Sequence, residues 1–159
     1  MHFKFSQTAK NFFADIITPE GSHGTHNKNK FKHQFDVYYC CAMIGLAAVQ
    51  RDDNTSDLKD LIEGYPKPYI DSKTQIAGLL VATEAERQGI DIQSPKLEEM
   101  MLQYLNDSET MLSEEGIKAL NAYALRGFQL IRDYPLSNPP TSREEFLEAF
   151  NIAIKQYTR

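Results

Sequence analysis

The sequence predicts an all-α fold, a single compact and irregular bundle of about six helices around a buried central helix at 36–51. The first reason is that 36–51 is as long as a helix and almost free of polar residues between its charged ends. A helix that is apolar on all sides must be enclosed by other helices. The second reason is that capping residues and apolar residues at helical spacing recur along the chain. The third is that no segment shows the sustained alternation of a half-buried strand.

The N-terminal part is expected to form one helix and one loop before the central helix. Residues 6–17 place apolar side chains on one side, and Pro19 with a nearby glycine ends this helix. The stretch 20–30 holds no apolar residue and is expected to be a mobile loop. Asp36 then caps the central helix, and the polar run 52–56 closes it.

Two short elements are expected before the next long helix. Residues 58–62 suggest a short amphipathic turn, and the two closely spaced prolines in 64–69 favour an extended connector. The third helix is expected to begin at Ser72, which has capping-box spacing with Gln75. Gly89 is expected to end that helix.

The C-terminal half shows three further helix starts. Ser94 followed by Pro95 combines a favourable N-cap with a proline at the first helical position. A fifth helix is expected over 113–134, with apolar residues repeating along one face. Ser142 and Glu145 have capping-box spacing and open the last helix.

The length of 159 residues fits one domain. Within it, we expect 1–34 to form the N-terminal helix with the polar and basic loop, and 35–159 to form the bundle core. No apolar stretch reaches the roughly 20 residues that span a bilayer, and no secretory signal is visible, which predicts a cytoplasmic protein. The adjacent Cys40 and Cys41 cannot form a disulfide without distorting a helix, so free and buried thiols are expected.

Basic residues gather in the loop before the central helix, although the chain has a net charge of −5. One interpretation is a solvated flexible loop, and the other is a basic finger that contacts nucleic-acid phosphates through Lys28, Lys30, Lys32 and His33. His23, His26 and His33 have the residue types of a zinc site. Ordering a long loop around a metal is costly, so no metal site is expected. No other cofactor is expected either.

Two connectors that combine tyrosine with proline form the candidate partner-binding surface. Rigid surfaces of this kind lose little entropy on binding, which suits protein recognition. The two connectors can meet at one end of the bundle, since one precedes a long helix and the other follows one. The alternative is that the rings fix the ends of their own helices. The candidate residues are Tyr65, Pro66, Pro68, Tyr69 and Tyr134.

Motifs that carry catalysis are missing from the sequence, including glycine-rich phosphate loops, nucleophile elbows, zincin motifs and the Glu-x-x-His pattern of di-iron bundles. Several glutamates fall in first helical turns, where a negative charge offsets the helix dipole without any catalytic role. Arg126 is expected to form a structural ion pair with Glu84 or Asp36. Gly127 beside it is expected to permit close helix approach.

Together these observations favour a non-catalytic cytoplasmic helical protein that acts as a protein-binding subunit or adaptor. Its partner is another protein or a second copy of the same chain, and neither a membrane nor a small-molecule substrate is indicated. The alternative is a nucleic-acid-binding accessory protein that uses the basic loop 28–33, for instance in a bacterial DNA-modification or phage-defence assembly. An enzyme or metal protein centred on the loop histidines ranks below both.

Overall fold

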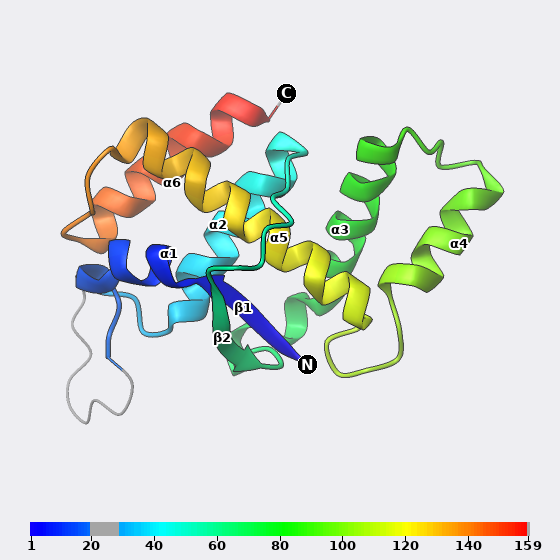
Figure 1. The fold of residues 1–159 in the computed structure, drawn as a ribbon, viewed down its shortest axis with the longest axis horizontal. Coiled ribbons are helices and arrows are strands. Elements are labelled where there is room, and N and C mark those ends of the chain that lie inside the picture. The colour runs from blue at the N-terminus through cyan, green and yellow to red at the C-terminus, as the bar shows by residue number, and fades with distance from the viewer. Residues whose placement is uncertain (20–28, 159) are drawn as a thin grey trace.

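Two long helices, α2 (Gln34–Ala48) and α5 (Glu114–Ile131), pack along each other and make the most extensive contact in the fold (Figure 1). The computed structural model describes residues 1–19 and 29–158. These residues form six α-helices and one small two-stranded sheet. The predicted helical class is therefore confirmed as a mostly helical fold.

Glycines let the backbones of α2 and α5 touch. A Cβ atom at Gly45 would lie 2.1 Å from the carbonyl oxygen of Tyr123, and one at Gly127 would lie 1.7 Å from the carbonyl oxygen of Cys41. Real Cβ atoms do not approach backbone this closely, so only glycine fits at either position. The expectation that Gly127 permits close helix approach is confirmed.

The predicted central helix at 36–51 corresponds to α2, but its complete enclosure is not confirmed. Eight of its fifteen residues are buried and the other seven are partly accessible. More of α5 is enclosed, with twelve of eighteen residues buried. The core is therefore shared between α2 and α5. Helix α2 ends at Val49, which adopts a left-handed conformation with φ of 55°.

The expectation that the chain forms no strand is wrong. Strand β1 (His2–Ser6) pairs antiparallel with β2 (Leu58–Glu63), with His2 opposite Glu63 and Ser6 opposite Leu58. Phe3 and Phe5 are buried, and their rings lie 5.8 and 5.6 Å from the ring of Tyr38 on α2. Each strand is too short for sustained alternation, and its pairing partner is distant in the sequence.

The first helix is shorter than the predicted 6–17. Helix α1 (Gln7–Phe12) begins where the Ser6 hydroxyl accepts the backbone N–H of Ala9 at 3.0 Å. A 3-10 turn (Ala14–Ile16) follows. The α-helix ends at Phe13, whose buried ring packs edge-on against Phe146 at a centroid distance of 5.3 Å. Tertiary packing overrides helix continuation at this point.

The segment before the third long helix also differs from the prediction. The expected amphipathic turn at 58–62 is part of β2, and the expected extended connector contains a 3-10 helix (Lys67–Ser72). Helix α3 (Lys73–Gln88) continues directly from that 3-10 helix.

Because the chain is already helical at Ser72 (φ −94°, ψ −1°), its side chain makes no capping hydrogen bond, and the predicted capping box with Gln75 is wrong. The predicted end of the helix at Gly89, with φ of 68°, is confirmed.

Serine caps open the next two helices as predicted. The hydroxyl of Ser94 accepts the N–H of Lys96 at 3.2 Å and opens α4 (Pro95–Tyr104). The hydroxyl of Ser113 accepts the N–H of Gly116 at 3.1 Å and opens α5. These two caps set the boundaries of the segment that joins α4 to α5.

The end of α5 and the start of the last helix agree with the sequence predictions only in part. Helix α5 ends at Ile131, before the predicted end at 134, and a π-helical turn (Arg132–Leu136) follows it. The Ser142 hydroxyl accepts the N–H of Glu145 at 3.1 Å and opens α6 (Arg143–Tyr157). The Glu145 carboxylate, however, accepts the N–H of Thr141 at 2.9 Å. Only half of the predicted capping box therefore forms.

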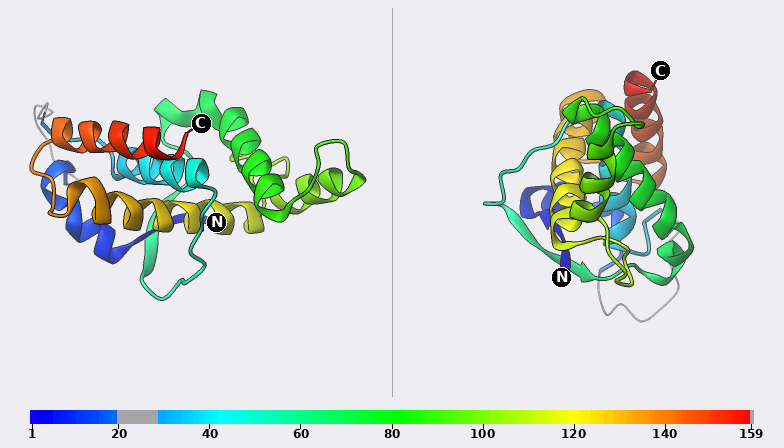
Figure 2. Two further views of the ribbon diagram at one scale, coloured as in Figure 1. Left: turned by 90° about the horizontal axis from the view of Figure 1, so that it is seen from above. Right: turned by 90° about the vertical axis from the view of Figure 1, so that its right-hand side faces the viewer.

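Helices α3 and α4 form a hairpin on one side of the fold, away from α1 and α6 (Figure 1). The left view of Figure 2 shows the same hairpin projecting from the bundle. Helix α4 makes its main contacts with α3 and the start of α5. Among the described residues, none of the helices combines the length and apolar character that crossing a membrane requires.

Candidate functional site

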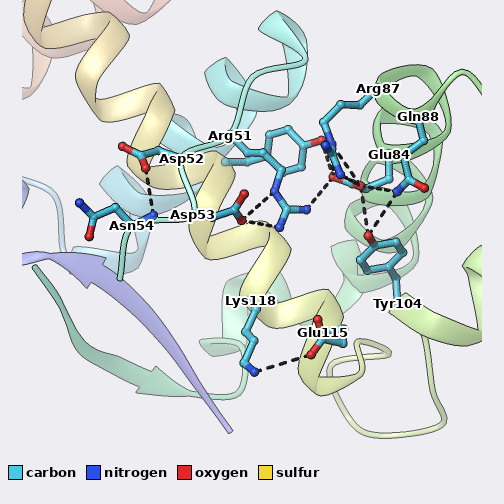
Figure 3. Close-up of polar contacts among 11 residues, drawn as sticks. Arg51, Asp52, Asp53, Asn54, Glu84, Arg87, Gln88, Tyr104, Glu115 and Lys118 are labelled. Atoms are coloured by element: carbon cyan, nitrogen blue, oxygen red, sulfur yellow. Dashed lines mark hydrogen bonds and ion pairs between the residues drawn. The ribbon is translucent and has the colours of Figure 1, made fainter. Parts of the chain in front are cut away.

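A buried carboxylate lies where α3 meets α5, α4 and the segment after α2 (Figure 3). The side chain of Glu84 is fully buried on α3. The Tyr123 hydroxyl donates to it from α5 at 2.7 Å, and the Tyr104 hydroxyl donates from α4 at 3.2 Å. One carboxylate thereby joins three helices.

Cationic and amide groups complete the shell around Glu84. Arg51, from the segment after α2, donates its Nη1 at 2.9 Å, and Arg87 donates its Nη2 at 2.8 Å. The side-chain amide of Gln88 donates at 2.8 Å. Arg51 also donates to the carboxylate of Asp53 at 2.5 and 3.0 Å, as Figure 3 shows.

These contacts determine the charge of the cluster. Burial alone raises the pKa of Glu84, but hydrogen bonds from Arg87, Tyr123, Gln88 and Arg51 outweigh it and lower the pKa to about 2. Burial and the nearby carboxylate raise the pKa of Tyr123. Glu84 is therefore ionised at neutral pH, and both of its oxygens accept several hydrogen bonds. Such a carboxylate is suited to holding helices together and poorly suited to accepting a proton from a substrate.

The predicted partner of Arg126 is wrong. Its Nε donates to the Gln50 side chain at 3.0 Å, and its Nη1 donates to Gln129 at 3.1 Å. Arg51 and Arg87 are the bases that pair with Glu84. Sequence reasoning missed this cluster because its donors come from four separate segments.

A polar cavity of about 720 Å³ lies beside this cluster, between the start of β1, the segment after α2 and the start of α5. Each lysine and arginine that lines it faces a carboxylate, and no cysteine or serine is among the described lining residues. Each of these basic side chains therefore has a neighbouring carboxylate that competes with an anionic ligand. The pairs are Lys4 with Asp60 (3.8 Å), Arg51 with Asp53 (2.5 Å) and Lys118 with Glu115 (3.6 Å).

A second hollow, of about 550 Å³, runs between α3 and α4 and is mainly apolar. We call it the α3–α4 groove. Its walls are small and aliphatic side chains from the two helices, from the loop that joins them and from the residue that follows α4. The apolar wall residues are Val81, Ala82, Ala85, Ile90, Ile92, Leu97, Met101 and Leu105.

Exposed apolar side chains concentrate on this same hairpin. Nine large hydrophobic side chains are exposed among the described residues, and four of them lie between the start of α3 and the end of α4. They are Leu79 (45% exposed), Ile92 (76%), Met101 (42%) and Leu102 (77%). Leu79 is exposed because Ile76 and Leu80 occupy the buried side of α3.

The residues of the predicted tyrosine–proline surface lie in two separate parts of the fold. The rings of Tyr65 and Tyr69 pack on Phe35 at 6.0 and 4.8 Å, and the Tyr69 hydroxyl donates to the Asp36 carboxylate. Tyr134 is 62% exposed and belongs to the turn that follows α5. Figure 1 shows the connection from α5 to α6 on a different side of the fold from the segment that leads into α3. The two connectors therefore do not meet.

Within the connector, Pro66 is buried and Pro68 is exposed. Whether any of these residues binds a partner stays a prediction.

The basic loop is described only in part. Lys28, His23 and His26 lie outside the described residues. Lys32 is exposed and Lys30 is partly accessible. The backbone N–H of His33 donates to Asp36 at 3.1 Å at the start of α2. Within 1–19 and 29–158, no group of three or more histidine, cysteine or acidic side chains could hold a metal ion. The nucleic-acid interpretation stays a prediction.

Comparisons with protein-family models, curated proteins and solved structures found no match to this chain. Among the described features, the α3–α4 groove combines a hollow with exposed apolar side chains, whereas the polar cavity has its lysines and arginine already paired.

Proposed function

We propose that this chain is a non-catalytic, cytoplasmic protein-binding subunit or adaptor, and that the α3–α4 hairpin is its main docking surface. The observation that carries the proposal is the apolar groove, whose lining includes the exposed Ile92 and Met101, with the exposed Leu102 next to Met101 on α4. Water-exposed apolar side chains gathered around one hollow mark protein interaction sites, whereas isolated ones need no explanation.

The chemistry of the groove supports a protein partner over a small molecule. Small-molecule sites combine apolar walls with several convergent polar groups that orient the ligand. The charged side chains that line this groove are Glu86 and Asp91, and the rest of its described wall is apolar or glycine. An open, aliphatic channel between two helices suits the side chains of another protein segment.

The two tyrosine–proline connectors are retained as two separate further contacts in this proposal. Pro68 in the first and Tyr134 in the second offer exposed surface, whereas the rings of Tyr65 and Tyr69 pack on the core. Replacing either packed tyrosine by alanine would lower stability as well as any binding. Tyr134→Ala is the better probe of the second connector, because its side chain is exposed.

The test is an affinity capture of the tagged full chain from its native organism, with and without nuclease. We expect a stoichiometric partner protein, or a second copy of the chain, that survives nuclease. Capture should fail with the double variant Ile92→Ser and Leu102→Ser. It should persist with Leu147→Ser and Ile152→Ser, which remove comparable exposed side chains from α6.

A protein that stays monomeric and recovers no stoichiometric partner would contradict the proposal. Recovery that disappears with nuclease, and with Lys30→Glu and Lys32→Glu, would instead favour the nucleic-acid alternative through the basic loop.

A further inference from the structure

The dimensions of the α3–α4 groove match a helix. Helix α4 has ten residues, so the wall that it provides is about 15 Å long, or about three helical turns. Leu97 and Met101 are four residues apart and lie on one face of α4, as Ala82 and Glu86 do on α3. Two neighbouring helices with such rows form a hollow into which the side-chain ridge of a third helix can pack.

The floor of the groove is open at Gly78. Apart from its two chain neighbours and the nearby backbone of α3, no described heavy atom would lie within 4 Å of a Cβ atom at this position. Gly78 is exposed and lies on the groove side of α3. A partner backbone can therefore approach α3 closely at this point, as α2 and α5 approach each other through their own glycines.

The charge around the groove is acidic. Glu86 and Asp91 line it, and none of the described lining residues is basic. Glu98 stands one helical turn before the exposed Leu102 on α4, so the two share a face. A complementary segment would carry lysine or arginine beside its apolar face.

From these features we infer that the α3–α4 groove binds a basic amphipathic helix of a partner protein. This inference rests on the proposed function and names the class of partner segment. The apolar face of that helix fills the channel over Gly78, and its basic flanks face Glu86, Asp91 and Glu98.

A second copy of this chain fits less well, because each copy has a net charge of −5. The exposed surface of α6 carries Glu144, Glu145 and Glu148 beside its apolar side chains. An acidic helix placed against an acidic rim would be repelled.

The experiment titrates the full chain with a fluorescent designed peptide of about 18 residues, which is about five helical turns. Leucines form its apolar face, and lysines flank that face. A second peptide replaces the lysines by glutamates. We expect the lysine peptide to bind at least about tenfold more tightly, because several exposed charge pairs differ between the two complexes. Charge reversal at Glu86 and Glu98 should remove that preference, whereas Glu148→Lys on α6 should preserve it.

Gly78 provides a matched pair of variants. Gly78→Gln puts a long side chain into the channel where the chain itself leaves space, and glutamine favours a helix more than glycine does. It should weaken binding of the lysine peptide at least about tenfold while the protein stays folded. Gly78→Ala adds only a methyl group and should change binding by less than about threefold.

Three results would overturn the inference. They are no saturable binding of the lysine peptide, equal binding of both peptides, or binding that Gly78→Gln leaves unchanged. A dimer in light scattering that Gly78→Gln dissociates would also overturn it, since a second copy would then fill the groove. The affinity capture remains a separate test: a nuclease-resistant partner that is lost with Ile92→Ser and Leu102→Ser but presents no basic helix would preserve the proposed function and defeat only the inference about the partner segment.

Discussion

Replacing Glu84 by glutamine removes one negative charge from the buried cluster and keeps the shape of the side chain. The pKa of this carboxyl is about 2 in the folded chain against an ordinary value of 4.5. That difference corresponds to about 3 kcal/mol of folding free energy at neutral pH. Because the pKa is lowered on folding, the contribution is present above pH 4.5 and is lost as the pH falls toward 2. The variant also leaves the side chain of Arg51, which is 16% exposed, without one of its two carboxylates.

The assay is urea unfolding of the wild type and of Glu84→Gln at pH 7 and pH 3. We expect the variant to be less stable by about 3 kcal/mol or more at pH 7. The difference in unfolding free energy between the two proteins should be about 2 kcal/mol smaller at pH 3, because much of the Glu84 contribution is lost at that pH. The other carboxyl groups titrate in both proteins, so their contributions cancel from the difference. Glu86→Gln is the control, since this exposed neighbour on α3 should change stability by less than about 0.5 kcal/mol at either pH. A difference in unfolding free energy below about 1 kcal/mol at pH 7, or one that is no smaller at pH 3, would refute the reasoning.

Three further predictions follow from close packing and burial. Gly127→Ala should cost about 3 kcal/mol or more in urea unfolding, because its Cβ would collide with the Cys41 carbonyl oxygen, and a loss below about 1 kcal/mol would contradict the close crossing. Burial, with a smaller contribution from the Asp36 charge, raises the pKa of the Cys40 thiol to about 12, and burial also raises that of Cys41. Neither thiol should react with a disulfide reagent at pH 7 until the protein is unfolded, and rapid native labelling would show that the site opens. Gly78→Ala should raise the free energy of unfolding by about 0.5–1 kcal/mol, and a loss measured in the same assay would show that its position is not open.

Features that depend on neighbouring residues could be predicted from the sequence. The predicted core stripe of α5 is buried in the structure, because apolar residues at helical spacing share a face whatever they pack against. The Ser94–Pro95 start and the Gly89 stop also agree, since each is set by its own backbone geometry and local hydrogen bonds. The stripe residues are Ile117, Leu120, Ala124, Phe128 and Ile131.

Features that depend on distant segments could not be predicted in the same way. Strands β1 and β2 are separated by more than fifty residues. Strand β1 alternates only over 3–5, and the apolar residues of β2 fall at 58, 61 and 62, which is a helical spacing. The donors around Glu84 come from four parts of the chain, so no local spacing indicates them.

The α3–α4 groove did leave a signal in the sequence. Helix α4 carries Leu97, Met100, Met101 and Leu102, which span a wider arc than one buried face requires. Only the structure shows which of these side chains remain exposed.

The contact of α2 with α5 through Gly45 and Gly127 also constrains how this sequence can evolve. A side chain gained at either position must push apart the two helices that make the most extensive contact in the fold, so selection should preserve both glycines even where surrounding core residues exchange with one another. Distant homologues should therefore be recognisable by this glycine pair on two apolar helices. A lineage that had lost one of the glycines would be expected to carry a rearranged helix crossing.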